Sequence, residues 1–404
     1  MGVAKLAPPP YNFIMLSQRN RWLLIAVPIA LILLWAAQQR GTPSNEGAIE
    51  LPPPLGRGLI YLSPADGTAQ LFHIDLATAE IKQLAEADEI TSFDLSADGG
   101  SLVYSEANAQ GGSDLWLMDL STRQPAILLD CGAQSCSDAA FSVNGDLLAY
   151  QTDFAEIWLL DMASGEREQV SPEEQLSREA QWSADGRLSY YVVPSERYEL
   201  VLPGNTNIDL YPNQTGERLS WAADGESFVA AEQLSTSLEL QSIAEAKATA
   251  GSATPQSTEA VPTVSSAPGL GLPDRLVSTL MRYSSNEAEP LFDVGDNLVE
   301  DTSPTFSPDG RWLAFTRKYL DEARWTPGRQ LWLFEMESGL ALAFSDSPNF
   351  HISAPVWSAD SSQIAFLRSN RIALNEPLEL WVIQVNGSGA RLLAVDAFAP
   401  QWIP

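Results

Sequence analysis

Six stretches of the sequence share one pattern: an apolar residue, a Ser or Ala, a short turn, and a β-favouring strand. The clearest copy is FSPDGRWLAF, residues 306–315. Asp309 can bond its own backbone and Gly310 can take a positive φ, so the stretch is typical of a hairpin turn between two strands. The other copies begin at Leu95, Phe141, Trp182, Trp221 and Trp357. The chain is therefore predicted to fold as repeated units of strands.

The residues after each hairpin also repeat. In the clearest unit LWLFEM (331–336) follows, then the turn ESG (337–339) and the short apolar run LALAF (340–344). Each unit is therefore predicted to hold four strands. Successive copies begin 39 to 51 residues apart, except for one interval of 85 between Trp221 and Phe306. A period of about 40 to 50 residues is typical of a propeller blade.

The two ends of the repeat region complement each other. The last residues, APQWIP (399–404), open a unit that stops after its first strand, whereas LIYLS (59–63) begins with a second strand. Pairing the two would close a ring and cover its exposed strand edges. We expect an all-β fold over residues 57–404: a seven-bladed β-propeller of four-stranded blades, closed by the C-terminal strand.

The pattern SPDGRWLAF followed by LWLFEM resembles the TolB-type Pro-Asp propeller repeat, which is related in shape to the WD repeat. The resemblance covers roughly residues 57–404. It implies a propeller. In the family that it resembles, the repeat occurs in envelope scaffold proteins, in the non-catalytic propellers of serine peptidases, and in many proteins with no known role, so it points to the fold more than to one function. Three residues depart from the pattern: Asn144 replaces the turn Asp, Ser361 replaces the turn Gly, and Pro308 has no counterpart in the other copies.

The long interval contains a segment of different composition. In residues 244–273, 22 of 30 residues are Ala, Gly, Ser, Thr or Pro. Such a segment cannot bury enough apolar surface to offset the entropy of ordering. We expect a disordered insert.

The first 40 residues contain no Asp or Glu, and residues 22–37 form an uncharged apolar run. The run predicts a transmembrane helix at 22–39, acting as a signal anchor. Lys and Arg are more frequent before the run than after it, so 1–21 is predicted to be cytoplasmic, 40–56 a linker, and the propeller extracytoplasmic at the cell membrane. A cleaved signal peptide is the alternative.

The composition limits the classes of function. The chain has 52 Asp and Glu against 23 Lys and Arg, a net charge of -29, which makes nucleic acid an unlikely ligand. It lacks a GxSxG elbow, an HExxH motif and a glycine-rich phosphate loop. We therefore expect no enzyme, no cofactor and no metal. A glycan-binding or glycan-cleaving propeller with carboxylates at the channel mouth is the alternative, and a ligand sensor with a short cytoplasmic tail is a third hypothesis.

The few cysteines and histidines are assigned individually. Cys131 and Cys136, in DCGAQSC, are predicted to form a local disulfide that pins a loop, and no zinc-ligand spacing is present. His73 lies in a strand pattern and is interpreted as structural. His351 is placed in a loop and is a candidate binding residue.

The topology predicts where recognition occurs. If the first strand of each unit is innermost, the SxDG turns share one face with the turns between third and fourth strands, and the longer connections share the other face. Recognition is expected on that long-loop face. The residue three positions before the one that opens a unit should lie at the rim of the central channel on this face. These residues include Asp138, Glu179 and Arg218. Alternatively, they are ordinary loop charges exposed to solvent. Trp325, in a long loop, is either an exposed contact or locally packed.

These observations predict a membrane-anchored, extracytoplasmic propeller that binds a protein partner of the cell envelope without catalysis. The candidate binding residues are Asp138, Glu179, Arg218, Trp325 and His351.

Overall fold

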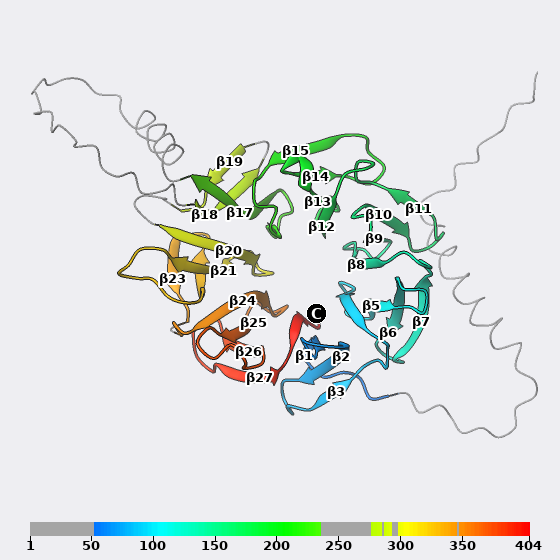
Figure 1. Ribbon diagram of the computed structural model, residues 1–404, viewed down its shortest axis with the longest axis horizontal. Coiled ribbons are helices and arrows are strands. Elements are labelled where there is room, and N and C mark those ends of the chain that lie inside the picture. Colours follow the sequence, from blue (N-terminus) through cyan, green and yellow to red (C-terminus); the bar gives the residue numbers. More distant parts are fainter. Residues whose placement is uncertain (1–51, 236–275, 285–286, 293–297, 346) are drawn as a thin grey trace, which may run out of the picture. The chain divides into compact units, whose positions relative to one another are not determined.

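The computed structural model describes residues 52–235, 276–284, 287–292, 298–345 and 347–404. Every described residue belongs to one compact unit, Pro52–Pro404. The described residues form strands and turns, with one 3-10 turn at Val193–Ser195 and no α-helix among them. The all-β propeller architecture is thus confirmed, and Figure 1 shows its sheets arranged in a ring.

Five sheets have four strands each. The sheet built from both ends of the repeat region contains β28 (Phe398–Trp402), β1 (Gly58–Ser63), β2 (Gln70–Asp75) and β3 (Ile81–Gln83). The next contains β4 (Ile90–Leu95), β5 (Ser101–Ala107), β6 (Ser113–Asp119) and β7 (Gln124–Leu129). The third contains β8 (Cys136–Phe141), β9 (Leu147–Thr152), β10 (Ile157–Asp161) and β11 (Arg167–Gln169). The fourth contains β12 (Ser177–Trp182), β13 (Leu188–Val192), β14 (Arg197–Val201) and β15 (Ile208–Pro212). The last contains β24 (Phe350–Trp357), β25 (Gln363–Asn370), β26 (Glu379–Gln384) and β27 (Arg391–Val395).

The sixth sheet has eight strands. Its members are β16 (Ser220–Trp221), β17 (Ser227–Ser235), β18 (Leu276–Ser284), β19 (Glu287–Pro290), β20 (Val299–Phe306), β21 (Trp312–Tyr319), β22 (Gln330–Glu335) and β23 (Leu340–Ala343). A parallel pairing between Ser278 and Glu300 joins β18 to β20. The prediction of seven four-stranded blades is therefore wrong: the structure has five separate four-stranded blades. The short β19 pairs only with Met281–Ser284 of β18, so the earlier part of the same edge, at Ser278, is open to β20 of the next unit.

The predicted membrane location also needs correction. In the ranges that the structure describes, no helix is long and apolar enough to cross a membrane. The single-pass localisation at the cell membrane is therefore not supported. The segments on which that prediction rested, 1–21 and the transmembrane helix and signal anchor at 22–39, lie outside the described residues, as does most of the linker 40–56.

The insert 244–273 also lies outside the described residues, but its flanks are placed. β17 and β18 pair antiparallel along their whole length, so that Ser235 lies opposite Leu276. β18 is therefore the third strand of its unit, and the connection between these residues leaves from the long-loop face.

The repeated turn is stabilised by its serine. The Ser96 hydroxyl donates to Asp98 Oδ1 at 2.6 Å and accepts the Ser101 N–H at 2.9 Å. Asp98 Oδ1 also accepts the Gly100 N–H at 2.9 Å. Four further turns repeat the serine bonds, in those of Ser142, Ser183, Ser307 and Ser358. These hydrogen bonds explain the recurrence of the motif better than the residue identities Pro-Asp-Gly do. In one copy Asn144 replaces the Asp, and its Oδ1 still accepts the hydrogen bond of the Ser142 hydroxyl at 3.0 Å.

The aromatic residue that opens a unit links neighbouring sheets. Three tryptophans each donate the indole Nε1–H to a main-chain carbonyl of the preceding sheet at 3.0 Å. The pairs are Trp182 with Ala140, Trp357 with Thr305, and Trp402 with Val356. Where Phe opens the unit, its own N–H is bound instead: Phe141 donates to Asp94 Oδ2 at 2.9 Å and Phe306 donates to Ser220 Oγ at 3.0 Å. These five innermost strands are thereby each tied to the preceding unit.

Apolar side chains fill the spaces between sheets. Where the two ends of the repeat region meet, Leu59 and Tyr61 of β1 pack with Ala365 and Leu380 of the preceding sheet, and all four are buried. Comparable clusters lie at the other junctions. Burial of apolar area between sheets is the main stabilising contribution in such a ring.

Candidate functional site

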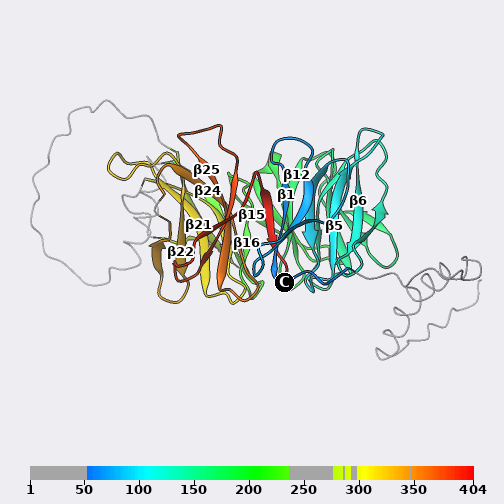
Figure 2. The ribbon, with the colours of Figure 1, turned by 90° about the horizontal axis from the view of Figure 1, so that it is seen from below.

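The ring has two faces of different character. In Figure 2 the C-terminus marks the lower face, on which the SxDG turns lie, and the longer connections reach above the opposite face. Six of the exposed large apolar residues lie in connections of the long-loop face, and two, Val143 and Leu202, lie in turns of the other face. The six are Phe154, Leu176, Val193, Trp325, Ile372 and Leu374. The long-loop face is therefore the more apolar one.

Asp138 and Glu179 lie at irregularities in the innermost strands β8 and β12. The pairing of each strand shifts register there, and the two residues have φ values of 49° and 59°. Non-glycine residues seldom adopt this left-handed conformation, which is typical of a β-bulge. The same conformation recurs in other innermost strands, at Ser303, Ala354 and Ala399. Arg218 differs, because it precedes β16 in an exposed, irregular stretch.

The predicted rim residues are not joined to one another by hydrogen bonds. Asp138 donates its N–H to Ser92 Oγ at 2.8 Å, in the preceding sheet. The positive charge of Arg218 acts on Asp94, yet burial dominates and raises the pKa of Asp94 to about 6. Glu217 was not predicted from the sequence. Desolvation raises the pKa of its carboxyl, and the charge of Arg329 is the largest of the effects that lower it. The position of Glu217 next to Arg218 was the available signal.

His351 is the centre of a cationic cluster on the long-loop face. The sequence analysis placed His351 in a loop, but it lies in β24 and is partly buried. Burial, followed by the charges of Arg329, Arg371 and Lys318, lowers the pKa of His351 to about 4. Its Nδ1 accepts the Arg329 N–H at 3.3 Å. The imidazole is therefore neutral at physiological pH and adds no positive charge to the cluster.

Two of these cations have no acidic partner in the described part of the chain. Lys318 Nζ lies 5.2 Å from the centre of the Trp325 ring, and neither Lys318 nor Arg371 forms an ion pair there. Arg329 bonds Glu300 Oε2 at 3.1 Å, and its Nε is buried without a hydrogen-bond partner in the same ranges. The cluster can accept an anionic group.

Exposed apolar side chains lie beside these cations. Trp325 is 54% exposed, Ile372 66% and Leu374 74%. Trp325 lies in the β21–β22 connection and the other two in the β25–β26 connection, which are neighbours on this face (Figure 2). The connections meet near the start of β24, where Arg371 donates its N–H to the Asn349 carbonyl at 2.8 Å. We call the set Lys318, Trp325, Arg329, Arg371, Ile372 and Leu374 the docking patch.

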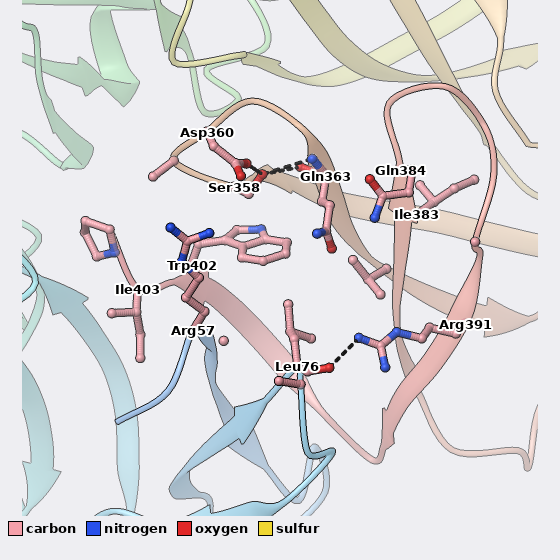
Figure 3. A pocket seen from close by; sticks show the side chains of 16 residues that line it. Arg57, Leu76, Ser358, Asp360, Gln363, Ile383, Gln384, Arg391, Trp402 and Ile403 are labelled. Carbon is pink, nitrogen blue, oxygen red and sulfur yellow. Dashed lines mark hydrogen bonds between the residues drawn. The ribbon is translucent and has the colours of Figure 1, made fainter. Parts of the chain in front are cut away.

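The opposite face contains a pocket of about 400 Å³ where the last sheet meets the β28-β1-β2-β3 sheet. Figure 3 shows Arg57 and Trp402 on one side of it, with Gln363 and Arg391 across from them. Arg391 donates to the Leu76 carbonyl at 3.0 Å. None of the predicted binding residues lines this pocket.

Cys131 and Cys136 form a disulfide with Cα atoms 6.2 Å apart. His73 is 2% exposed in β2, and its Nε2 lies 3.1 Å from the Gly56 carbonyl oxygen, a structural role. Within the described ranges, no three His, Cys, Asp or Glu side chains are grouped so as to hold a metal ion.

Comparison with known proteins identifies the fold. No protein-family model matches the chain, and no curated protein matches its sequence. Among solved structures, the β-propeller domain of the Trilobed protease from Pyrococcus furiosus is similar at 14% identity and a TM-score of 0.53, covering 85% of this chain and 95% of that one. A prolyl endopeptidase is similar at 11% identity and a TM-score of 0.51, covering 76% of this chain and 43% of that one.

TolB from Acinetobacter baumannii is also similar, at 12% identity and a TM-score of 0.47, covering 97% of this chain and 74% of that one. Propellers of the expected TolB type are thus among the similar solved structures. At these identities the similarities show the propeller fold and leave the function to the residues of this chain.

Proposed function

We propose that the propeller is a non-catalytic protein-binding module that takes an acidic polypeptide segment on the docking patch. The observation that supports this most directly is the convergence of Lys318, Arg329 and Arg371 on a neutral His351, in a chain whose net charge is -29. Arg329 is paired with Glu300. However, Lys318 and Arg371 form no ion pair within the described residues, so they would attract a complementary anionic segment, whereas the acidic remainder of the chain would repel a second copy.

The apolar side chains of the patch supply the contact area. Trp and Arg are the residue types most enriched among those that dominate binding energy, especially next to apolar side chains that exclude water. Trp325 has Lys318 against one part of its ring but remains more than half exposed. A partner segment with acidic residues next to Leu or Phe would pair with both the cations and the exposed Trp325, Ile372 and Leu374.

The test uses fluorescence anisotropy with a labelled peptide in which glutamates alternate with leucines, and with its counterpart in which every Glu is Lys. We expect binding of the acidic peptide only, weakening as salt rises. Arg371→Glu and Trp325→Ala should each weaken binding at least about tenfold. Val143→Ala is the matched control, because it removes an exposed apolar side chain, 50% exposed, from the other face.

A crosslinking experiment addresses the natural partner. A photoreactive residue at Leu374, compared with one at Val143, should give a covalent adduct with one protein whose crosslinked segment is acidic. An Asp138→Ala, Glu179→Ala, Arg218→Ala variant shows whether the channel mouth takes part. Equal binding of both peptides, or unchanged binding by Arg371→Glu and Trp325→Ala, would refute the proposal.

A further inference from the structure

A second cavity lies on the long-loop side, between the β7–β8 connection and strands β9 to β11. It has a volume of about 350 Å³, in the lower part of the range for small-molecule sites. We call it the disulfide pocket. Its main lining residues are Asp130, Tyr150, Thr152, Glu156, Trp158 and Arg167, together with the disulfide itself.

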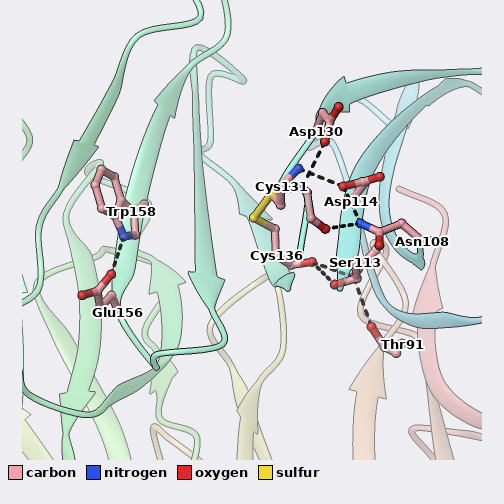
Figure 4. Close-up of a disulfide and its surroundings, with 11 residues drawn as sticks. Thr91, Asn108, Ser113, Asp114, Asp130, Cys131, Cys136, Glu156 and Trp158 are labelled. Carbon is pink, nitrogen blue, oxygen red and sulfur yellow. Dashed lines mark hydrogen bonds between the residues drawn. A yellow bond between two sulfur atoms is a disulfide. The ribbon is translucent and has the colours of Figure 1, made fainter. Parts of the chain in front are cut away.

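The wall formed by the disulfide is held in place from behind (Figure 4). Asp114 Oδ1 accepts the Cys131 N–H at 2.8 Å and an Asn108 amide N–H at 3.0 Å. The Cys136 carbonyl accepts the hydroxyls of Ser105 and Ser113 at 2.7 Å and 2.9 Å. The pocket is therefore preformed, which lowers the entropy cost of binding a ligand.

Thr152 provides an independent sign of a ligand. The residue is 9% exposed, and its Oγ1 is buried without a hydrogen-bond partner in the described residues. A buried hydroxyl in this state is costly, and native proteins seldom leave one unpaired. A ligand group that both donates and accepts a hydrogen bond would satisfy it.

The other groups define the class of ligand. Asp130 and Glu156 offer carboxylate oxygens and Arg167 offers N–H donors. Trp158 presents an indole whose Nε1–H is already engaged with Glu156 Oε2 at 3.1 Å, so its ring remains as an apolar surface. Two carboxylates against one guanidinium disfavour an anion. Hydroxyl groups around a ring with an apolar side fit this arrangement.

We propose that the disulfide pocket binds one neutral saccharide unit, either a free sugar or the end of a glycan. The sugar hydroxyls pair with Thr152, Glu156 and Arg167, and the ring lies against Trp158. This site is separate from the docking patch and does not depend on the function proposed for it.

The test is titration calorimetry and saturation-transfer NMR on the full chain. The probes are methyl glycosides of glucose, galactose and mannose, and N-acetylglucosamine, with glucuronate, glycine and serine as members of other classes. At least one neutral sugar should bind, and glucuronate should not. A free sugar and a glycan end are distinguished by comparing the methyl glycoside, whose anomeric oxygen is blocked, with the reducing sugar.

Thr152→Val should weaken sugar binding about tenfold, the effect of losing roughly one hydrogen bond. The matched control, Thr78→Val on an exposed turn of the other face, should bind as the wild type does. Thr152→Val should unfold at or above the wild-type temperature, because valine leaves no unpaired hydroxyl, so weaker binding would not reflect misfolding. The proposal fails if no neutral sugar of the panel binds, if only glycine or serine binds, or if Thr152→Val binds as the wild type does.

Discussion

Removing the serine hydroxyl of one SxDG turn tests the explanation of the repeat. Ser96→Ala deletes the bond to Asp98 at 2.6 Å and leaves the Ser101 N–H without the acceptor it has at 2.9 Å. A neutral hydrogen bond contributes about 1 kcal/mol and one to a charged group about 1.5 to 3. Asp98 is exposed, so water can replace part of the hydrogen bonding that its carboxylate loses. We expect destabilisation by about 2 kcal/mol.

The pH dependence has a defined sign. The Ser96 hydroxyl, followed by the Gly100 N–H, lowers the pKa of Asp98 below its ordinary value. A depressed carboxyl pKa stabilises the fold above the unfolded-state pKa, and this stabilisation disappears as the pH falls through the folded-state pKa. The difference between Ser96→Ala and wild type should therefore be largest at neutral pH and shrink below about pH 4.

The chain supplies its own reverse experiment, because the turn at Trp221 has Ala222 where the others have Ser. Ala222→Ser should add the missing hydroxyl beside Asp224 and increase stability. Urea denaturation gives the free energies of unfolding, and amide hydrogen exchange of residue 101 reports the local change. If Ser96→Ala changes neither quantity and Ala222→Ser gives no gain, the serine bonds do not explain the repeat.

Three further predictions concern the channel and the core. Burial raises the pKa of Asp94 to about 6, so ionisation of this group destabilises the fold increasingly from about pH 4, the unfolded-state pKa, and fully above about pH 6. Asp94→Asn should therefore raise the melting temperature at pH 7.5, and the gain should vanish near pH 4. Glu179, at φ 59°, should tolerate Glu179→Gly with unchanged or higher urea stability, whereas Glu179→Val should lower it. Asp301 is 0% exposed and bonds Arg317 at 2.6 Å and 2.7 Å; Asp301→Ala should cost about 3 to 5 kcal/mol by the same assay, because it leaves a buried guanidinium unpaired.

The sequence was a good guide where one local rule repeats. Ser96 and its equivalents recur at fixed positions, and the turn chemistry alone predicts hairpins and then a propeller. The number of separate blades was not predictable in this way. The Ser278 and Glu300 pairing depends on how far β18 extends beside β20, which is a property of two units together and leaves no local trace in either one.

The candidate site shows the same limit. The sequence placed Asp138 and Glu179 three residues before Phe141 and Trp182, but it did not predict the bulges at which they lie. Of the cluster around His351, the sequence predicted His351 and Trp325 but not the cations, since no sequence pattern connects Arg329 with Arg371. They meet because separate connections converge at the start of β24, and convergence of that kind requires the folded ring.

The pairing of β1 with β28 affects the order in which the molecule folds. These strands come from opposite ends of the repeat region, so their contact has the longest sequence separation in the ring, and we expect it to form late because its loop-closure entropy is the largest. Until then one edge of β1 has unpaired backbone groups. This strand is also apolar, with Leu59, Ile60 and Leu62 all fully buried in the finished structure. An open apolar edge invites aggregation or capture by a chaperone. Closure thus serves as a check on assembly, because only a chain with every sheet in place can hide that edge.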